Sequence, residues 1–233
     1  MGQNQQVFEK ANTAYNQGNY KEAVDNYEKI LNSGETSATL YYNLGNSYYK
    51  LNNVASSIYY YEKALQLDPG NEDILNNLKF AQNMAMDDIK EVQETGVSRI
   101  MNSFLSVLSF NGWAWLAVVT AFLFAILFLV YYFSAATRYK RLFFTFAISF
   151  FVISLFSLGI AFQQYQLIQN SEFAIVFSEE APVRSEPNAR GDELFLLHEG
   201  TKIEVKETFQ DWIKLELANG AEGWIEKEEV RIL

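Results

Sequence analysis

The chain of 233 residues carries few side chains that could perform covalent chemistry, and they are not grouped. It has no cysteine, which excludes thiolate nucleophiles, thiolate metal sites and disulfides. His198 is the single histidine and has no nucleophile motif near it, so we expect a strand residue and not a catalyst or metal ligand. Asp87, Asp88, Glu91 and Glu94 lack the glycine turn of a calcium loop, and we expect them to form a solvated face. Glycine-rich phosphate loops and nucleophile elbows are absent too, so we expect no enzyme, no cofactor and no metal.

Asparagine and tyrosine instead recur at a fixed spacing in the first third of the chain. Residues 20–31 match residues 54–65 at an offset of 34. The same offset relates Phe8, Asn12 and Tyr15 to Tyr42, Asn46 and Tyr49. A 34-residue period of paired helices is typical of tetratricopeptide repeats. Residues 1–95 therefore resemble such an array, with about two and a half repeats and a capping helix that runs on toward Thr95.

Resemblance to these arrays implies a concave groove lined by the first helix of each repeat. The candidate partner-binding residues in that phase are Phe8, Asn12, Tyr15, Tyr42, Asn43, Asn46, Tyr49, Lys50 and Asn77, and Asn16, Thr39, Asn76 and Phe80 share the phase. Side-chain amides can bond peptide backbone groups and aromatic rings give contact area, which suits an extended peptide or a helix. Only Lys50 is basic, so we do not expect recognition of a carboxylate terminus. In the alternative interpretation these residues merely brace or solubilise the array.

The middle of the chain is apolar and has no acidic residue between positions 97 and 170. Residues 113–133 and 142–162 are uncharged runs of 21 residues, each about 31 Å long as a helix and matched to a bilayer core of about 30 Å. They predict a two-helix transmembrane hairpin joined by residues 134–141. The alternative, a pair of buried helices in a soluble protein, is disfavoured because such helices are usually shorter. The acidic soluble segments, with an overall charge of −10, argue against nucleic acid as a partner.

The basic residues of the loop predict the orientation. Arg138, Lys140 and Arg141 crowd residues 134–141, whereas the upstream flank offers only Arg99. Short loops rich in Lys and Arg stay in the cytoplasm, so we expect a two-pass protein of a bacterial inner membrane with both soluble domains in the periplasm. Residues 1–6 do not resemble an export signal, and we hypothesise that one was removed from this numbering. The alternative is a cytoplasmic N-terminus that breaks the charge rule.

Residues 96–112 show the spacing of one helical face. Its apolar residues are Val97, Ile100, Met101, Phe104, Leu105 and Leu108. With Trp113 and Trp115 following, the segment is predicted to lie in the membrane interface, or alternatively to pack on protein. Within the first span Ala117, Ala121 and Ala125 recur every four residues, and we expect this stripe to pack on the second span or on another membrane protein.

Residues 172–233 change to short alternating runs broken by Gly and Asn, which indicates a compact all-β unit. The segments at residues 181–187, 197–203, 212–215 and 223–225 resemble bacterial SH3-like domains. In so small a barrel we expect Trp212 and Trp224 to carry much of the burial. The functional alternative makes both tryptophans part of a site for a peptide or a cell-wall polymer.

The order of these parts predicts a multidomain membrane protein with an all-α tetratricopeptide solenoid, a two-helix transmembrane hairpin and a small all-β SH3-like barrel. It resembles the BatE-type membrane proteins of the Bacteroides aerotolerance (Bat) operon, a likeness that includes AIVFSEEAPVRSEP and LFLLHEGTKIEV. This resemblance implies partners among von Willebrand A-domain Bat proteins, an indirect link to a MoxR-type ATPase, and a stress or aerotolerance role. We therefore expect a non-catalytic scaffold that binds protein partners and the lipid bilayer. The rivals are a cell-wall-binding sensor or accessory subunit of a wall enzyme, and a hydrolase with an unrecognised site.

Overall fold

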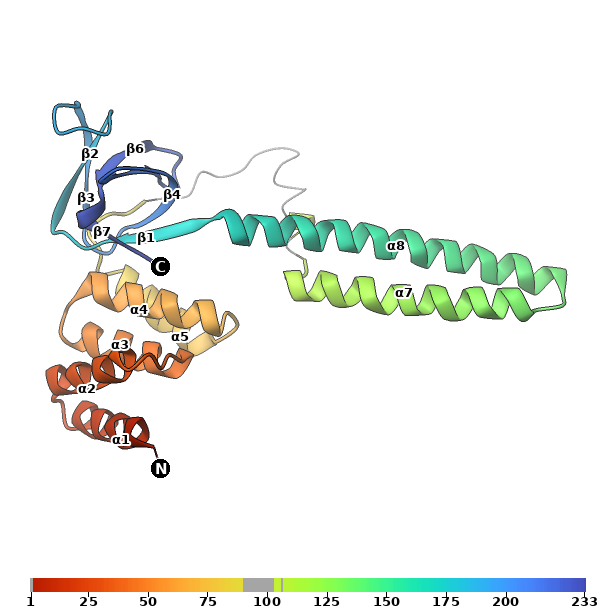
Figure 1. Cartoon of the computed structure of the whole chain (residues 1–233), viewed down its shortest axis with the longest axis horizontal. Helices are drawn as coiled ribbons and strands as arrows, with labels where there is room; N and C mark the ends of the chain where they lie inside the picture. The colour runs from red at the N-terminus through yellow and green to blue at the C-terminus, as the bar shows by residue number, and fades with distance from the viewer. Residues whose placement is uncertain (1, 90–102, 106) are drawn as a thin grey trace. The chain divides into compact units, whose positions relative to one another are not determined.

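The computed structural model describes residues 2–89, 103–105 and 107–233, which form two compact units. One unit contains the helical repeats together with the β-barrel, and the other contains a helical hairpin. Figure 1 shows the helices of the array in red to yellow, the hairpin in green to teal and the barrel in blue. The predicted fold class, with an all-α array, two long apolar helices and an all-β barrel, is confirmed.

The array consists of five helices that stack in chain order (Figure 1). They are α1 (Gln3–Asn16), α2 (Tyr20–Asn32), α3 (Ala38–Lys50), α4 (Val54–Leu67) and α5 (Glu72–Gln82). Side chains cap several of them, and Asn53 and Asn71 accept hydrogen bonds from the first backbone N–H groups of α4 and α5. Gly45 lets α3 and α4 close, because a Cβ at this position would lie 2.6 Å from the Tyr61 ring.

The predicted capping helix toward Thr95 is wrong for the residues that the structure describes. Helix α5 ends at Gln82, and residues 83–89 are not helical. The reason is that this segment turns to the barrel, where Asp87 accepts hydrogen bonds and Ile89 packs against the interior. Asp87 is therefore not part of a solvated face, while Glu91 and Glu94 lie outside the described residues.

The barrel is a single antiparallel sheet of seven strands in the order β3-β2-β6-β5-β4-β1-β7. The strands are β1 (Glu172–Val176), β2 (Glu180–Arg184), β3 (Glu193–His198), β4 (Lys202–Phe209), β5 (Trp212–Glu216), β6 (Glu222–Glu226) and β7 (Val230–Ile232), with a short turn η1 (Lys227–Glu229) before the last. Its interior is aliphatic and includes Val183, Ile213 and Ile225. Neither Trp212 nor Trp224 belongs to this cluster. Trp212 is buried, as expected, but the expectation is wrong for Trp224, which is half-buried because side chains alternate along β6 and Ile225 takes the inward position.

The hairpin consists of α7 (Phe110–Phe133) and α8 (Thr137–Asn170). Only residues 134–136 separate the helices, fewer than the predicted loop of 134–141, because the basic residues begin α8. Both helices are long and apolar enough to cross a membrane, and only 11% and 17% of their most apolar windows are buried. Core helices of a soluble protein are mostly buried, so this exposure fits the transmembrane interpretation better.

The two helices pack along one seam of α7, where Trp113, Ala117 and Thr120 are buried. Ser154 Oγ donates to the Ala117 carbonyl oxygen across this seam at 2.9 Å. Ala121 and Ala125 are exposed. Of the predicted alanine stripe, only Ala117 is therefore buried against α8. The reason is that the buried positions of α7, Trp113, Ala117 and Thr120, are separated by four and then three residues, whereas the alanines are separated by four each time.

The segment before α7 folds back on the hairpin. Residues 103–105 are helical, residues 107–109 are not, and the Ser109 side chain caps α7. The prediction of a continuous helix over 96–112 is therefore wrong at residues 107–109. Val97, Ile100 and Met101 lie outside the described residues. The Leu105 carbonyl accepts from Trp113 Nε1 at 3.0 Å and from Gln164 Nε2 at 2.7 Å, which fixes this segment on both helices.

Candidate functional site

The groove asparagines form a hydrogen-bonded rung between the first two repeats. Asn12 Oδ1 accepts from the Tyr27 hydroxyl at 2.6 Å and from Asn43 Nδ2 at 3.2 Å. Tyr27 comes from α2, Asn12 from α1 and Asn43 from α3, so one carboxamide oxygen connects three helices. The Tyr27 side chain is 1% exposed, and burial raises its pKa to about 12, which keeps the hydroxyl a donor at neutral pH.

A second rung repeats this arrangement 34 residues later. Asn46 Oδ1 accepts from the Tyr61 hydroxyl at 2.7 Å and from Asn77 Nδ2 at 2.8 Å. Asn77 Nδ2 also donates to the Tyr42 hydroxyl at 2.9 Å. Burial raises the pKa of Tyr61 as well, so it too remains protonated. The rungs favour the bracing interpretation for the oxygens of Asn12 and Asn46.

Other parts of the groove side chains remain available. Among the described residues the Nδ2 groups of Asn12 and Asn46 donate no hydrogen bond. Lys50 and Phe80 are exposed, and Phe80 takes the position of Asn12 and Asn46 in the third repeat with 59% of its surface accessible. The groove therefore offers amide donors along its length and an apolar ring at its last repeat.

The remaining aromatic candidates are partly used in packing. Phe8 lies with its ring centroid 5.7 Å from that of Tyr27, and Tyr15 lies 5.3 Å from Tyr20. Tyr49 packs against the buried cluster of α4 and α5. A cavity of about 620 Å³ opens beside Phe8 and is lined also by Thr39. The first repeat is therefore the part of the groove with an open depression.

The end of the array is attached to the barrel through one carboxylate. Asp87 Oδ2 accepts from the His198 backbone N–H at 2.7 Å and from Thr201 Oγ1 at 2.6 Å, and Asp87 Oδ1 lies 2.7 Å from His198 Nδ1. Burial alone would raise the pKa of Asp87, but the hydrogen bonds from Thr201 and His198 outweigh it and hold the pKa below its usual range. His198 is the last residue of β3, as predicted, and its ring contacts Asp87 of the segment that leaves the array.

Apolar and ionic contacts extend this attachment. Ile175 of β1 is fully buried in the cluster formed by α4 and α5. Gly200 has a φ of +88°, and a Cβ there would lie 2.9 Å from Val54 Cγ1, so the residue is required for both its backbone and its lack of a side chain. Lys202 Nζ pairs with Glu62 Oε2 at 2.8 Å. Sequence reasoning did not predict this interface.

The two tryptophans of the barrel lie on neighbouring strands but in different surroundings. Trp212 is buried, with 9% of its surface exposed. Trp224 is half-buried, and Arg184 and Lys214 are its cross-strand partners on either side. Arg184 is held by a hydrogen bond from Nη1 to the Gly191 carbonyl oxygen at 3.0 Å. Trp224 with its two cations is therefore the more accessible of the two candidates.

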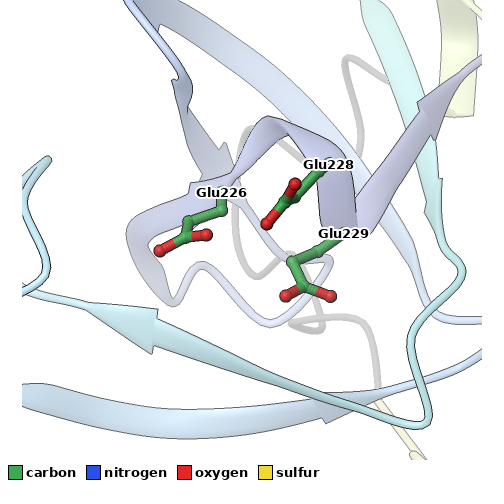
Figure 2. Close-up of side chains that lie close together, drawn as sticks. All are labelled: Glu226, Glu228 and Glu229. Carbon is green, nitrogen blue, oxygen red and sulfur yellow. The ribbon is translucent and has the colours of Figure 1, made fainter.

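An acidic turn lies between β6 and β7. Figure 2 shows Glu226, Glu228 and Glu229, whose carboxylate oxygens lie within 4.8 Å of one another. Ser178 Oγ donates a hydrogen bond to Glu229 Oε2, which commits one of the three carboxylates to the barrel. The turn is at the surface, where water screens the repulsion between the carboxylates.

The comparisons with known proteins agree with these two modules. A tetratricopeptide repeat model matches residues 38–71, a second model described as TPR repeat matches residues 11–52, and a bacterial SH3 domain model matches residues 179–231. No curated protein matches the chain. Among solved structures, an NlpC/P60 family protein from Bacillus cereus is 18% identical, with a TM-score of 0.24. That match covers 30% of this chain and 23% of the other, so the chain spans less than a quarter of its length.

Proposed function

We propose that the chain is a non-catalytic, membrane-anchored scaffold that captures protein partners on the concave face of its repeat array. The observation that carries the proposal is the divided use of Asn12 and Asn46, whose oxygens brace the helices while their amide N–H groups stay available. Bracing orients these donors in advance, so a partner peptide can offer its carbonyl oxygens without reordering the groove. The cavity beside Phe8 gives such a peptide room for one side chain.

Crosslinking from the groove tests this function. A photoreactive residue at Thr39 should capture a partner in cells, because Thr39 lines the cavity, is exposed and makes no bracing contact among those described. Capture should fall about tenfold in the double variant Lys50→Ala/Phe80→Ala, which removes two exposed groove side chains. The matched control is Leu67→Ala, since Leu67 is 54% exposed on α4 but outside the groove phase. Equal capture by both variants would refute binding in the groove.

The hairpin is proposed to anchor this scaffold in a bacterial inner membrane with both modules in the periplasm. The exposed apolar surface of α7 and α8 supports the anchor, and Arg138, Lys140 and Arg141 beside the turn support a cytoplasmic tip. Because the chain has no cysteine, single substitutions report topology directly. In intact spheroplasts an impermeant maleimide should label Ser33→Cys and spare Ala135→Cys. The reverse pattern would invert the orientation.

The resemblance to BatE-type proteins supports a more specific proposal about partners. It points to von Willebrand A-domain membrane proteins and, through them, to a MoxR-type ATPase in a stress or aerotolerance complex. Mass spectrometry of proteins co-purified in mild detergent tests this, with the Lys50→Ala/Phe80→Ala variant as the control. Recovery of other partners in a groove-dependent manner would keep the scaffold and reject the Bat-type complex.

A second candidate function, cell-wall binding, is favoured by Trp224 on the barrel. Lys214 is paired with Glu222 at 2.7 Å, so the Trp224 ring together with Arg184 is the pair that suits a polymer with apolar surface and carboxylates. Pull-down of the full-length protein in detergent with purified cell wall tests it. Retention that is lost in Trp224→Ala would favour a wall sensor, and the same weak retention of both proteins would reject it.

A further inference from the structure

Among the described residues the third repeat contributes α5 alone, because residues 83–89, which follow it, are not helical. In the first two repeats the position of closest approach between paired helices is small, Ala11 in α1 and Gly45 in α3. The equivalent position in α5 is Lys79, which is exposed. A long cation cannot sit where a helix packs within van der Waals contact, so α5 must be held by something else.

The barrel supplies those missing contacts. The buried cluster that contains Ile74 and Leu78 of α5 also contains Ile58 of α4 and Ile175 of β1. The chain leaving α5 is then fixed five residues later, where Asp87 accepts three hydrogen bonds from β3 and the β3–β4 turn. Helix α5 is therefore held on one side by the array and at its C-terminal end by the barrel.

The side of α5 next to this buried face belongs to the groove. Asn77 lies one residue before Leu78, and its Nδ2 group bonds both Asn46 and Tyr42 of α3. We propose that docking of the barrel controls the last rung of the groove, so that release of the barrel loosens α5 and weakens partner binding. This inference rests on the proposed function, because it describes the regulation of the same groove. Linkage requires the reverse effect as well, so a partner bound across Asn46 and Asn77 stabilises the docked barrel.

Hydrogen exchange on the full-length protein in lipid nanodiscs tests the coupling without needing a partner. The variant Asp87→Ala/Lys202→Ala removes two polar attachments of the barrel and no groove side chain. Amides of α5 should then exchange about tenfold faster, while those of α1 keep the wild-type rate. Lys206→Ala is the matched control, since Lys206 and Lys202 are both 36% exposed but Lys206 pairs only with Glu204 and Glu216 of the barrel.

The outcomes separate the coupling from the function itself. Unchanged exchange of α5, within about twofold, in a variant whose β1 amides exchange faster would overturn the inference. Protection of the β5 and β6 amides from exchange reports whether the barrel stays folded in the Asp87→Ala/Lys202→Ala variant. If the barrel of that variant unfolds, Gly200→Ala provides a second undocking variant, which should show the same faster exchange of α5. Faster exchange of α5 with undiminished crosslinking from Thr39 would also overturn the inference, yet leave the scaffold intact. Absence of crosslinks in the wild type would reject the scaffold, whatever α5 does.

Discussion

Replacing Asn46 with alanine removes the one acceptor that Tyr61 and Asn77 share. Both hydrogen bonds are short, at 2.7 and 2.8 Å, and the Tyr61 side chain is 1% exposed. Each lost hydrogen bond costs about 1 kcal/mol, and the buried hydroxyl left without an acceptor adds a desolvation penalty. We therefore expect Asn46→Ala to lower the free energy of unfolding by about 2–3 kcal/mol.

A double-mutant cycle isolates this interaction. Tyr61→Phe removes the hydroxyl together with its need for an acceptor, so it should cost only about 1 kcal/mol. In that background Asn46→Ala should cost about 1 kcal/mol less than it does alone, because no buried donor is orphaned. Asn76→Ala is the control, since Asn76 shares the groove phase, is exposed and makes no hydrogen bond among the described residues.

The assay is urea unfolding of the full-length protein in detergent, followed by circular dichroism at a helical wavelength. A cost for Asn46→Ala below about 0.5 kcal/mol, or equal costs for Asn46→Ala and Asn76→Ala, would refute the rung as a stabilising contact. The expected result also has a practical consequence. If variants of Asn12 or Asn46 lose partner capture, the loss can come from unfolding as well as from weaker binding. Variants of Lys50 and Phe80 report binding alone.

Three further predictions follow from other contacts. Gly200→Ala should destabilise the protein by about 1–2 kcal/mol in urea because it adds strain and a close contact, whereas Gly70→Ala, with nothing within 4 Å, should not. The lowered pKa of Asp87 means that its carboxylate contributes stability that is present above its usual value of 3.8 and is lost as the pH falls through the lowered pKa. The difference in free energy of unfolding between the wild type and Asp87→Asn should therefore be constant above about pH 5 and shrink as the pH falls from there through the lowered pKa, and a difference that stays constant over that range would contradict the contact. Gln164→Leu should speed hydrogen exchange at residues 103–105 without changing α7, because it deletes one of the two donors to the Leu105 carbonyl; equal exchange rates in the variant and the wild type would show that Gln164 does not hold this segment.

The 34-residue period was sufficient to predict the array and the helix that carries each groove residue. It also held a signal for the rungs, because Tyr27 and Tyr61 recur at the same offset as Asn12 and Asn46. A buried tyrosine needs an acceptor, and a repeated carboxamide one helix away is a natural one. What the period could not show is that the oxygen and the nitrogen of one side chain serve different purposes.

The burial of Trp224 was predicted wrongly because the size of its side chain was weighed above its position along the strand. In Trp212-Ile213-Lys214-Leu215 the aliphatic residues alternate with tryptophan and lysine, which places Ile213 and Leu215 on the same face. Following that alternation gives the aliphatic interior that the structure shows. The domain resemblance was right and Trp212 is buried, but Trp224 was assigned to the wrong side of the sheet.

Docking of the barrel on the array had no signal in the sequence. Asp87 and His198 are 111 residues apart, and neither the repeat period nor the SH3-like segment that contains His198 indicates that they meet. Helical and strand periodicity report contacts within an element or between neighbours along the chain. Asp87 was therefore predicted to lie on a solvated face and His198 to be a strand residue, and the contact between them was not predicted.

The attachment of the barrel determines at which end of the array further repeats can be added. A further 34-residue helix pair inserted at the exposed turn between Glu35 and Thr36 would lengthen the solenoid and leave α4 seated on Gly200. The same insertion after α5 would carry Asp87 away from His198 and leave the solenoid with an uncovered terminus. Lineages or engineered versions of this architecture should thus vary in repeat number at the N-terminal side, while the last pair before the barrel stays invariant in length.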